Sequence, residues 1–498
     1  MQCVLIANRG EIAVRIIETL RRLNITSALV VSEPDVDSLA ADLADVVVPI
    51  GGQSALESYL DVDKIIQAAK TVNADGIHPG YGFLSEKVEL VQACEQAGIK
   101  FIGPSRKAIE IMGDKIKSRQ LMISGDVPVV PGFELNESED LDLLMDQAHK
   151  IGFPLMVKAA SGGGGKGMRA VHDEKDLIDA IESCRREASS SFSDSRVFVE
   201  KLIENPRHIE IQVFGDSQGN IVHLNERECS IQRRHQKVIE EAPASFDMGE
   251  LRFQMGEVAI KAAQLVDYEG AGTVEFIYST EGDFYFLEMN TRLQVEHPVT
   301  EFTHGVDLVS AQIKVACGES LTWAQKELNP RGHALEVRLY AEDPLKDFMP
   351  TPGEIVKLVW PRKRDWLRLD AGVKEYSKVS PFYDPMIAKL IVHGDTRSQA
   401  IDRMIKVLGE LQIYGVVTNQ SYLIEILSNR EFQGGNINTS FIEDMEIEKA
   451  LRQKFESNLS AFLSIHDQKS RTGIWLVEEI LPAHNYGKHI LYSPNQLV

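Results

Sequence analysis

Residues 284–301 read FYFLEMNTRLQVEHPVTE, and polar side chains occupy every second position in the middle of this stretch. The alternating residues are two carboxylates, two amides and one guanidinium: Glu288, Asn290, Arg292, Gln294 and Glu296. Successive side chains of an extended chain point to opposite faces, so the pattern gathers these groups on one side. It predicts a site for metal ions and a small anion, with a solvated edge strand as the alternative. Because grouping around a small anion requires a bend, we expect the strand itself to end near Asn290.

The preceding segment supplies a second carboxylate. GAGTVEFIYSTEGDFYFLEMN is typical of a β-hairpin with its turn at STEGD, so Glu275 can lie opposite Glu288 across the ladder. Two such carboxylates repel each other unless a cation lies between them. With Asn290 they form an all-oxygen set, which suits Mg²⁺ or Mn²⁺ rather than zinc.

The composition limits the class of protein. A chain of 498 residues with 43% hydrophobic content suits two to four domains of a globular protein. The formal net charge of −21 argues against nucleic-acid partners and against an anionic membrane surface. No apolar run approaches the roughly 20 residues of a membrane span. These numbers favour a cytosolic enzyme that binds anions through a few local cations.

The ends and the cysteines of the chain add two expectations. The start, MQCVLIANRGEIAVRII, is interpreted as a strand that runs into an amphipathic helix, without a cleavable leader. The five cysteines are scattered without a CxxC pair, which excludes a zinc cluster by spacing and indicates a reducing compartment.

The order of predicted elements divides the chain. Strands alternate with helices over residues 1–113, which predicts a parallel sheet with both faces covered. NRGEIA resembles an anion-binding helix start but lacks a dinucleotide fingerprint, so no NAD site is assigned. Residues 114 to about 205 suggest a small α+β unit, and strands dominate from Arg207 onward, followed by a mixed region after Pro330.

A glycine loop stands between two predicted strands of the small unit. SGGGGKG at 161–167 formally contains Gly162-x-Gly164-x-x-Gly167, but a strand rather than a helix follows it. It is not a P-loop either, because glycine follows Lys166. What remains is a hairpin tip rich in N–H groups that can close over phosphates, and a plain flexible linker is the alternative.

Two further polar groups leave alternatives open. His208, Glu210 and Gln212 share one face of a predicted strand, although a lone histidine there is more often structural. The charged run 226–237 fits a solvated face and a functional site about equally well, since it follows a strand pair and ends at EEAP.

Taken together, these segments resemble the biotin carboxylase family within the ATP-grasp superfamily. The likeness covers residues 1 to about 445 in order and rests on long strings. They are ANRGEIA (7–13), HPGYGFLSE (78–86), MGDK (112–115), KAASGGGGKGM (158–168), ENPRHIEIQV (204–213), RECSIQRRHQKVIEEAP (227–243), GAGTVEF (270–276), EMNTRLQVEHPVTE (288–301), AEDP (341–344) and YDPMIAKLI (383–391).

The resemblance implies a role for individual residues. Those that would bind ATP through its phosphates, its adenine or the closing loop are Lys115, Lys158, Gly164, Gly165, Lys166, Glu200, Lys201, Leu202, Ile203, His208, Gln232 and His235. Two Mg²⁺ or Mn²⁺ ions would be held by Glu275, Glu288 and Asn290. Bicarbonate would be gripped by Lys237, Arg292, Gln294 and the Val295 backbone. Glu296 would be the general base, and Arg338 would stabilise the biotin enolate.

The implied reaction is the ATP-dependent carboxylation of biotin by bicarbonate through carboxyphosphate, with metal ions and lysines neutralising the crowded oxygens. The sequence contains no MKM biotinylation tripeptide, so biotin is expected on a separate carrier protein unless the chain is truncated. A separate carboxyltransferase subunit would choose the final acceptor, and RLYAEDPLKDFMPTPGEI leans toward acyl-CoA carboxylases. The resemblance also implies a homodimer.

The implied fold is multidomain α/β and α+β. It comprises a Rossmann-like domain at 1–113 and an ATP-grasp and C-terminal biotin carboxylase region at 114–445, with a mobile lid at about 130–204. Residues 446–498 form an extension that would dock a partner, begin a partner-binding domain or be disordered, and Trp475 to Val477 favour an ordered contact. A cytoplasmic location is expected, or an organellar matrix if a transit peptide has been removed.

Two other functions compete with this interpretation. Another ATP-grasp ligase that joins a carboxylate to an amine would share the glycine loop and the Glu275/Glu288 pair, but it has no need for RLQVEHP or Arg338. A non-enzymatic nucleotide-binding regulator would be expected to lack a metal carboxylate or the base, and all of these are present.

Overall fold

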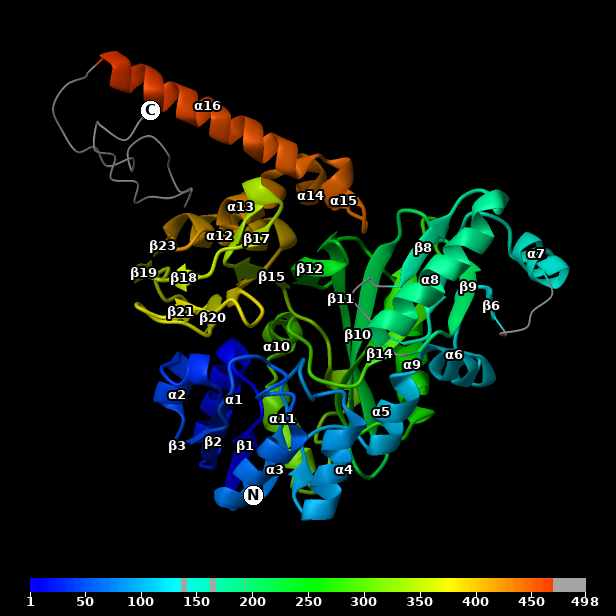
Figure 1. Cartoon of the computed structure of the whole chain (residues 1–498), viewed down its shortest axis with the longest axis horizontal. Helices are drawn as coiled ribbons and strands as arrows, with labels where there is room; N and C mark the ends of the chain where they lie inside the picture. The colour runs from blue at the N-terminus through cyan, green and yellow to red at the C-terminus, as the bar shows by residue number, and fades with distance from the viewer. Residues whose placement is uncertain (136–140, 162–166, 193, 469–498) are drawn as a thin grey trace.

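The computed structural model describes residues 1–135, 141–161, 167–192 and 194–468, and Figure 1 shows them as three packed parts. The N-terminal part contains a five-stranded parallel sheet of order β3-β2-β1-β4-β5, which confirms the predicted sheet. Its strands are β1 Cys3–Ile6, β2 Thr26–Val31, β3 Val46–Pro49, β4 Gly76–His78 and β5 Lys100–Phe101. Its helices are α1 Gly10–Arg22, α2 Leu39–Leu43, α3 Val62–Thr71 and α4 Val88–Ala97. Apolar side chains pack against both faces of this sheet, since β1 residues Val4 and Leu5 belong to different core clusters.

A small antiparallel domain follows the connecting helices α5 Arg106–Met112 and α6 Lys115–Ser124. Its sheet has the order β6-β9-β7-β8, formed by β6 Gly132–Glu134, β7 Leu155–Ala159, β8 Met168–Val171 and β9 Val197–Lys201. Helices α7 Leu141–Ile151 and α8 Leu177–Phe192 supply Leu144 and Ile181 to its core. The β7–β8 hairpin confirms the strands predicted on either side of the glycine loop, whereas residues 162–166 lie outside the described residues.

The third part is built on an eight-stranded sheet of order β14-β13-β10-β11-β12-β15-β22-β20. Its strands are β10 Arg207–Gly215, β11 Ile221–Arg233, β12 Gln236–Ala242, β13 Gly270–Tyr278, β14 Phe284–Asn290, β15 His333–Tyr340, β20 Leu367–Ala371 and β22 Met386–Gly394. Helix α9 Leu251–Gln264 packs on β10 and β11, and α12 Arg397–Glu410 packs on β15 and β22. The sheet therefore runs without a break from the predicted metal hairpin to the C-terminal helices.

The charged run 226–237 is a β-hairpin whose first half, residues 226–231, is buried and whose turn is exposed, so its interpretation as a solvated face is wrong for the first half. Glu226, Arg227 and Glu228 lie in β11 and are at most 2% exposed. A two-residue turn at Arg234 and His235, with φ of +50° and +64°, leads into β12, which the sequence reading did not recognise. These side chains pair with opposite charges from β10 and α9, namely Glu210, Arg207 and Arg252, and the local pattern does not reveal those partners.

The stretch 284–301 is a strand only up to Asn290, as expected from the need for a bend. Beyond it the chain turns, and Glu296 stands at the N-cap of helix α10 His297–His304. The single polar face drawn from alternation is therefore wrong past Asn290, and a turn brings the later residues of the row to the site.

The remaining helices and strands complete the third part. The helices are α11 Leu308–Ala316, α13 Gln420–Ser428, α14 Arg430–Gly434, α15 Phe441–Asp444 and α16 Ile447–Gln468. The short strands are β16 Glu342–Asp343, β17 Met349–Pro350, β18 Gly353–Glu354, β19 Lys357–Val359, β21 Lys378–Val379 and β23 Gln412–Tyr414. Helix α16 confirms the predicted helical start of the extension and projects along one edge of the molecule (Figure 1). Trp475 to Val477 lie outside the described residues.

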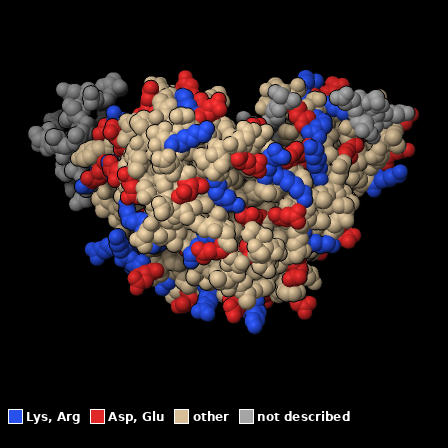
Figure 2. Space-filling view, turned by 90° about the horizontal axis from the view of Figure 1, so that it is seen from below, with Lys and Arg blue, Asp and Glu red and all other residues tan. Residues whose placement is uncertain are grey.

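Three further observations bear on the expectations from composition. No helix among the described residues is long and apolar enough to cross a membrane. All five cysteines fall within the described ranges and are free thiols. Acidic and basic side chains are interspersed on the face shown in Figure 2.

Candidate active site

A cavity of about 550 Å³ lies where the small domain meets the large sheet. Eleven of the residues with a predicted nucleotide or metal role line it: Lys115, Lys158, Glu200, Lys201, Leu202, Ile203, His208, Gln232, His235, Glu275 and Glu288. They come from α6, β7, β9 and the hairpins of the large sheet, so distant segments converge on one space. Gly164, Gly165 and Lys166 lie outside the described residues.

Cations and carboxylates alternate on the wall of this cavity. Lys115 is the first residue of α6, whose N-cap Asp114 accepts hydrogen bonds from the backbone N–H groups of Ile116 and Lys117. The ammonium of Lys115 lies 3.2 Å from the Glu288 carboxylate. Lys158 on β7 forms an ion pair with Glu200 on β9. The ammonium of Lys201, in contrast, donates to the carbonyls of Gly152 and Phe153 at 3.0 and 2.9 Å. Lys115 and Lys158 are thus held by carboxylates on the wall of the cavity.

The two predicted metal carboxylates are direct neighbours across the ladder. Glu275 on β13 is the register partner of Glu288 on β14, which confirms the pairing deduced from the hairpin. Asn290 donates to Glu275 Oε1 at 2.9 Å, so all three residues of the predicted oxygen set belong to one hairpin. Glu288 is partly exposed toward the cavity, whereas Glu275 and Asn290 are buried.

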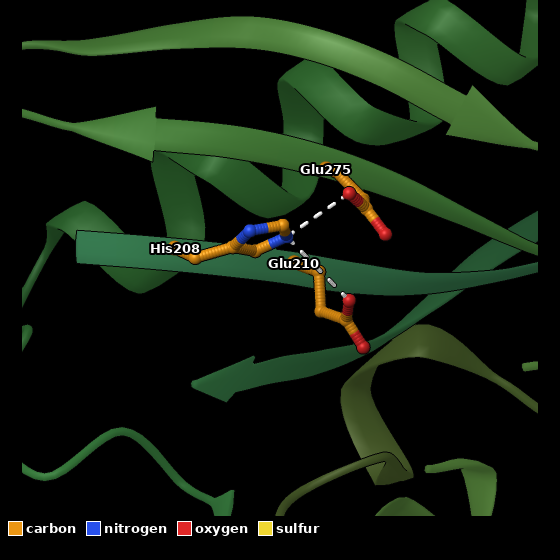
Figure 3. A group of neighbouring side chains, drawn as sticks. All are labelled: His208, Glu210 and Glu275. Carbon is orange, nitrogen blue, oxygen red and sulfur yellow. Dashed lines mark ion pairs between the residues drawn. The ribbon is translucent and has the colours of Figure 1, made fainter. Parts of the chain in front are cut away.

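A histidine and two carboxylates meet on the neighbouring strands (Figure 3). His208 Nε2 lies 3.0 Å from Glu275 and 3.9 Å from Glu210, a geometry that could hold a metal ion. The ammonium of Lys237, however, lies 2.5 Å from Glu210 and 2.8 Å from Glu275. This group is therefore a buried ion-pair network in which Lys237 already compensates both carboxylates.

Lys237 extends the network to the predicted base. Its Nζ lies 2.6 Å from Glu296 Oε1, and Glu296 Oε2 accepts from Arg338 Nη2 at 3.1 Å. The contacts Glu275–Lys237–Glu296–Arg338 thus form one continuous chain of charges. Glu275 and Glu296 are buried, and the side chains of Lys237 and Arg338 are only 12% and 11% exposed, so water screens these interactions little.

The charges set the protonation of the two carboxylates that touch Arg338. Burial would raise the pKa of Glu296, but the cations Lys237, Arg338 and Arg227 outweigh it and lower that pKa below its ordinary value. Burial raises the pKa of Glu240 to about 7, although the charge of Arg338 acts to lower it. Arg338 Nε donates a hydrogen bond of 2.6 Å to Glu240. Glu296 is therefore an anion at neutral pH.

A second cavity of about 510 Å³ opens on the other end of this chain of charges. Arg292, Val295 and Arg338 line it together with Tyr81 and Gly82 of the HPGYGFLSE string. Arg292 is fixed by Glu86, which accepts from its Nε at 2.7 Å, and by Asn290, which accepts at 3.0 Å. Glu296 and Lys237 thus lie between a cavity lined by the lysines and a cavity lined by the arginines.

Arg227 lies beneath these groups with its side chain 0% exposed, and the sequence pattern predicts no role for it. Its guanidinium donates to the side chains of Glu210, Gln212, Thr273, Gln294 and Thr300. Through Gln294 it reaches the site, because the amide of Gln294 donates in turn to Glu275 at 2.8 Å. Tyr81, Glu86 and Glu240 also contribute without having been predicted to do so, although they lie in segments 78–86 and 227–243 that carry the resemblance; their tertiary contacts reveal them.

Three family models match the chain in succession. They are the biotin carboxylase N-terminal domain over residues 1–109, the carbamoyl-phosphate synthase L chain ATP binding domain over 114–324, and the biotin carboxylase C-terminal domain over 336–444. The chain is 49% identical over 442 residues to a biotin carboxylase of Halalkalibacterium halodurans, covering 88% of this chain and 96% of that protein. It is also 49% identical to the mitochondrial methylcrotonoyl-CoA carboxylase subunit alpha of Rattus norvegicus, covering 88% of this chain but only 61% of that subunit.

A solved structure matches most of the chain. The biotin carboxylase domain dimer of the 2-oxoglutarate carboxylase of Hydrogenobacter thermophilus, in complex with MgADP, ADP and bicarbonate, superposes with a TM-score of 0.85 at 41% identity. The match covers 90% of this chain and 98% of that one. With the high identity to a biotin carboxylase over nearly that protein's whole length, these matches are decisive. The chain therefore belongs to the biotin carboxylase family of ATP-grasp ligases.

Proposed function

We propose that this chain carboxylates biotin with bicarbonate at the expense of ATP, as the first half-reaction of a biotin-dependent carboxylase. The observation that supports this most directly is the chain of contacts Glu275–Lys237–Glu296–Arg338, which joins the two cavities. A carboxylate-amine ligase would need the first cavity and its metal carboxylates, but it would have no use for a buried base paired with an arginine at the second.

The first cavity fits a nucleotide with its metal ions. Glu275 and Glu288 offer adjacent carboxylates, Asn290 offers an amide oxygen, and such hard oxygen donors are what Mg²⁺ and Mn²⁺ prefer. When bound, the ions would neutralise phosphate oxygens during phosphoryl transfer. Lys115, Lys158 and His208 would contact the phosphates, while residues 200–203 and His235 would border the base. In the relative from Hydrogenobacter thermophilus the same domain holds MgADP.

The buried base would handle the proton of bicarbonate. Lys237, Arg292, Gln294 and the Val295 backbone are proposed to bind the anion beside Glu296, which accepts its proton. The cations that lower the pKa of Glu296 also favour a bound anion, and an added negative charge raises the pKa of a neighbouring carboxylate. Entry of bicarbonate would thus increase the basicity of Glu296 at the moment it is needed. The resulting dianion would attack the γ-phosphate and displace ADP to give carboxyphosphate. Carboxyphosphate would break down to carbon dioxide and phosphate, and the phosphate would take the N1′ proton of biotin to form the enolate.

The second cavity would take the ureido ring of biotin. Arg338 Nη2 contacts Glu296, and its permanently charged guanidinium is suited to stabilise an enolate oxygen until carbon dioxide is captured. Glu240 holds the same guanidinium from beneath through Arg338 Nε.

The assembly proposed around this chain follows its relatives. The biotin would be attached to a carrier domain, and a carboxyltransferase would pass the carboxyl group to acetyl-, propionyl- or methylcrotonyl-CoA, pyruvate or another acceptor. A homodimer is proposed, in a cytoplasmic or organellar setting. The proposed domains are 1–113, 114–445 with a lid at about 130–204, and an extension from 446 that would dock a partner.

An assay of ADP release tests this function. Its three conditions are bicarbonate alone, bicarbonate with free biotin, and bicarbonate with an amine in place of biotin. We expect ADP release that requires bicarbonate and rises when biotin is added. If biotin leaves the rate unchanged and an amine accelerates it, the chain is a carboxylate-amine ligase instead.

Replacing Glu288 with glutamine is expected to weaken the dependence of turnover on Mg²⁺. The change removes one negative charge from the oxygen set but keeps the side chain's shape, so the Mg²⁺ concentration at half-maximal rate should rise by roughly tenfold or more. The matched control is Glu281→Gln in the exposed turn of the same hairpin. A Mg²⁺ titration that coincides for Glu288→Gln, Glu281→Gln and the unmodified chain would remove Glu288 from the ligand set.

A further inference from the structure

Lys389 is a fully buried lysine on β22, the strand next to the edge strand β20 of the large sheet, and the mechanism above makes no use of it. Its side chain is 0% exposed on β22, and its register partners are Arg338 on β15 and Asp370 on β20. An ammonium so placed loses its hydration, and an apolar residue there would often be tolerated as well or better. A buried cation next to another cation, Arg338, therefore calls for a specific set of contacts.

The first contact of Lys389 is with the backbone beside the base. Its Nζ donates to the carbonyl of Val295 at 2.6 Å. That carbonyl belongs to the peptide that joins Val295 to Glu296, so the ammonium fixes the main chain from which the Glu296 side chain projects. The side chain of Glu296 is held separately by Lys237 and Arg338.

The second contact crosses to the N-terminal domain. Lys389 Nζ lies 3.3 Å from Glu11 Oε1, and the same oxygen accepts a hydrogen bond from the hydroxyl of Tyr81. Glu11, Tyr81 and Val295 all line the second cavity. Burial would lower the pKa of Lys389, but Glu11, Glu336 and Asp370 outweigh it and raise that pKa above its ordinary value. Lys389 therefore remains a cation, and it joins the turn at Val295 to Glu11 and Tyr81 of the N-terminal domain.

We infer that Lys389 is a positioning residue for the biotin-carboxylating step: it holds the Val295–Glu296 peptide and, through Glu11, the Tyr81 hydroxyl in one fixed arrangement around the second cavity. This inference rests on the proposed function. Its physical basis is that a displacement of about 1 Å of a reacting group can cost about 10²-fold in rate. The nucleotide cavity has no wall residue in common with this tie, so its ligands should be unaffected.

The test compares Lys389→Met with variants at the other end of the tie. Lys389→Met and Glu11→Leu should each lower biotin-dependent turnover by about 10²-fold and raise the KM for biotin and bicarbonate. The KM for ATP and the Kd for MgADP should stay unchanged in both. Glu11→Gln keeps an oxygen that accepts from Tyr81 and Lys389, and should restore most of the activity lost in Glu11→Leu.

Tyr81→Phe supplies an independent arm, because it removes a single hydroxyl and leaves the Lys389–Glu11 pair in place. It should raise the KM for biotin while melting at the temperature of the unmodified chain. The inference is overturned if Lys389→Met keeps normal biotin kinetics, if it raises the KM for ATP as much as that for biotin, or if Tyr81→Phe leaves the KM for biotin unaltered. Absence of any bicarbonate- and biotin-dependent ADP release in the unmodified chain would instead refute the proposed function.

Discussion

Replacing Glu296 with glutamine is expected to lower biotin-dependent turnover by about 10²–10⁴-fold, the range typical of a lost general base. The amide keeps the size of the side chain and its hydrogen-bonding capacity, but it cannot accept the proton of bicarbonate. The folded state should persist, because Lys237 retains Glu210 and Glu275 as partners and Arg338 retains Glu240. Steady-state rates of ADP release with bicarbonate and biotin measure the loss.

Two controls separate the loss of the base from a general disturbance. The affinity for MgADP, measured by calorimetry, should be unchanged, since Glu296 does not line the nucleotide cavity. Glu319→Gln, which alters an exposed carboxylate after α11, should keep full turnover. Turnover of Glu296→Gln close to that of the unmodified chain would exclude Glu296 as the base.

Replacing Arg227 with methionine is expected to lower the free energy of unfolding by about 3–5 kcal/mol, the cost of breaking a buried ion pair from one side. Methionine fills a similar volume but leaves Glu210 without its nearest cation and four polar side chains without their donor. Urea denaturation measures the change. Because Arg227 also orients Gln294, turnover of the protein that still folds should fall as well.

The same charged run offers a matched control. Arg234 is 64% exposed and pairs with Asp347, which is 73% exposed, so Arg234→Met should cost no more than about 1 kcal/mol. Equal losses of stability in the Arg227 and Arg234 variants would contradict the buried network and support a solvated face for the whole run.

The contrast between these two arginines shows where local pattern fails. Both stand in one run of charge, and polar neighbours on either side of each arginine are compatible with an exposed side chain. Burial of Arg227 depends on carboxylates, amides and hydroxyls from β10, β13, α10 and the turn that precedes α10. The local sequence of the run 226–237 is therefore compatible with a solvated face, and the strands on both sides of it explain why Arg227 is buried.

Alternation of polar residues along 284–301, in contrast, located the candidate site. It found the polar row, and the hairpin it predicts does pair Glu275 with Glu288. It did not describe the backbone after Asn290, where the chain turns into α10 and Glu296 takes the N-cap position. Strand geometry is a local property, whereas the bend that gathers Arg292, Gln294 and Glu296 depends on Glu86, Arg227 and Arg338 from other segments.

Local sequence patterns were enough to predict the parallel N-terminal sheet, the hairpin around the glycine loop, the hairpin of the metal carboxylates, and the residue types of the site. These follow from hydrophobic periodicity and turn residues, which act over a few positions. Three features emerged from the folded arrangement alone: the lysines and carboxylates form one cavity, Lys237 and Glu296 join it to a second cavity, and Arg227 and Lys389 are buried beneath them. The reason is physical: the position of a buried charge is set by its partners, and here the partners lie on distant segments that meet only in the folded chain.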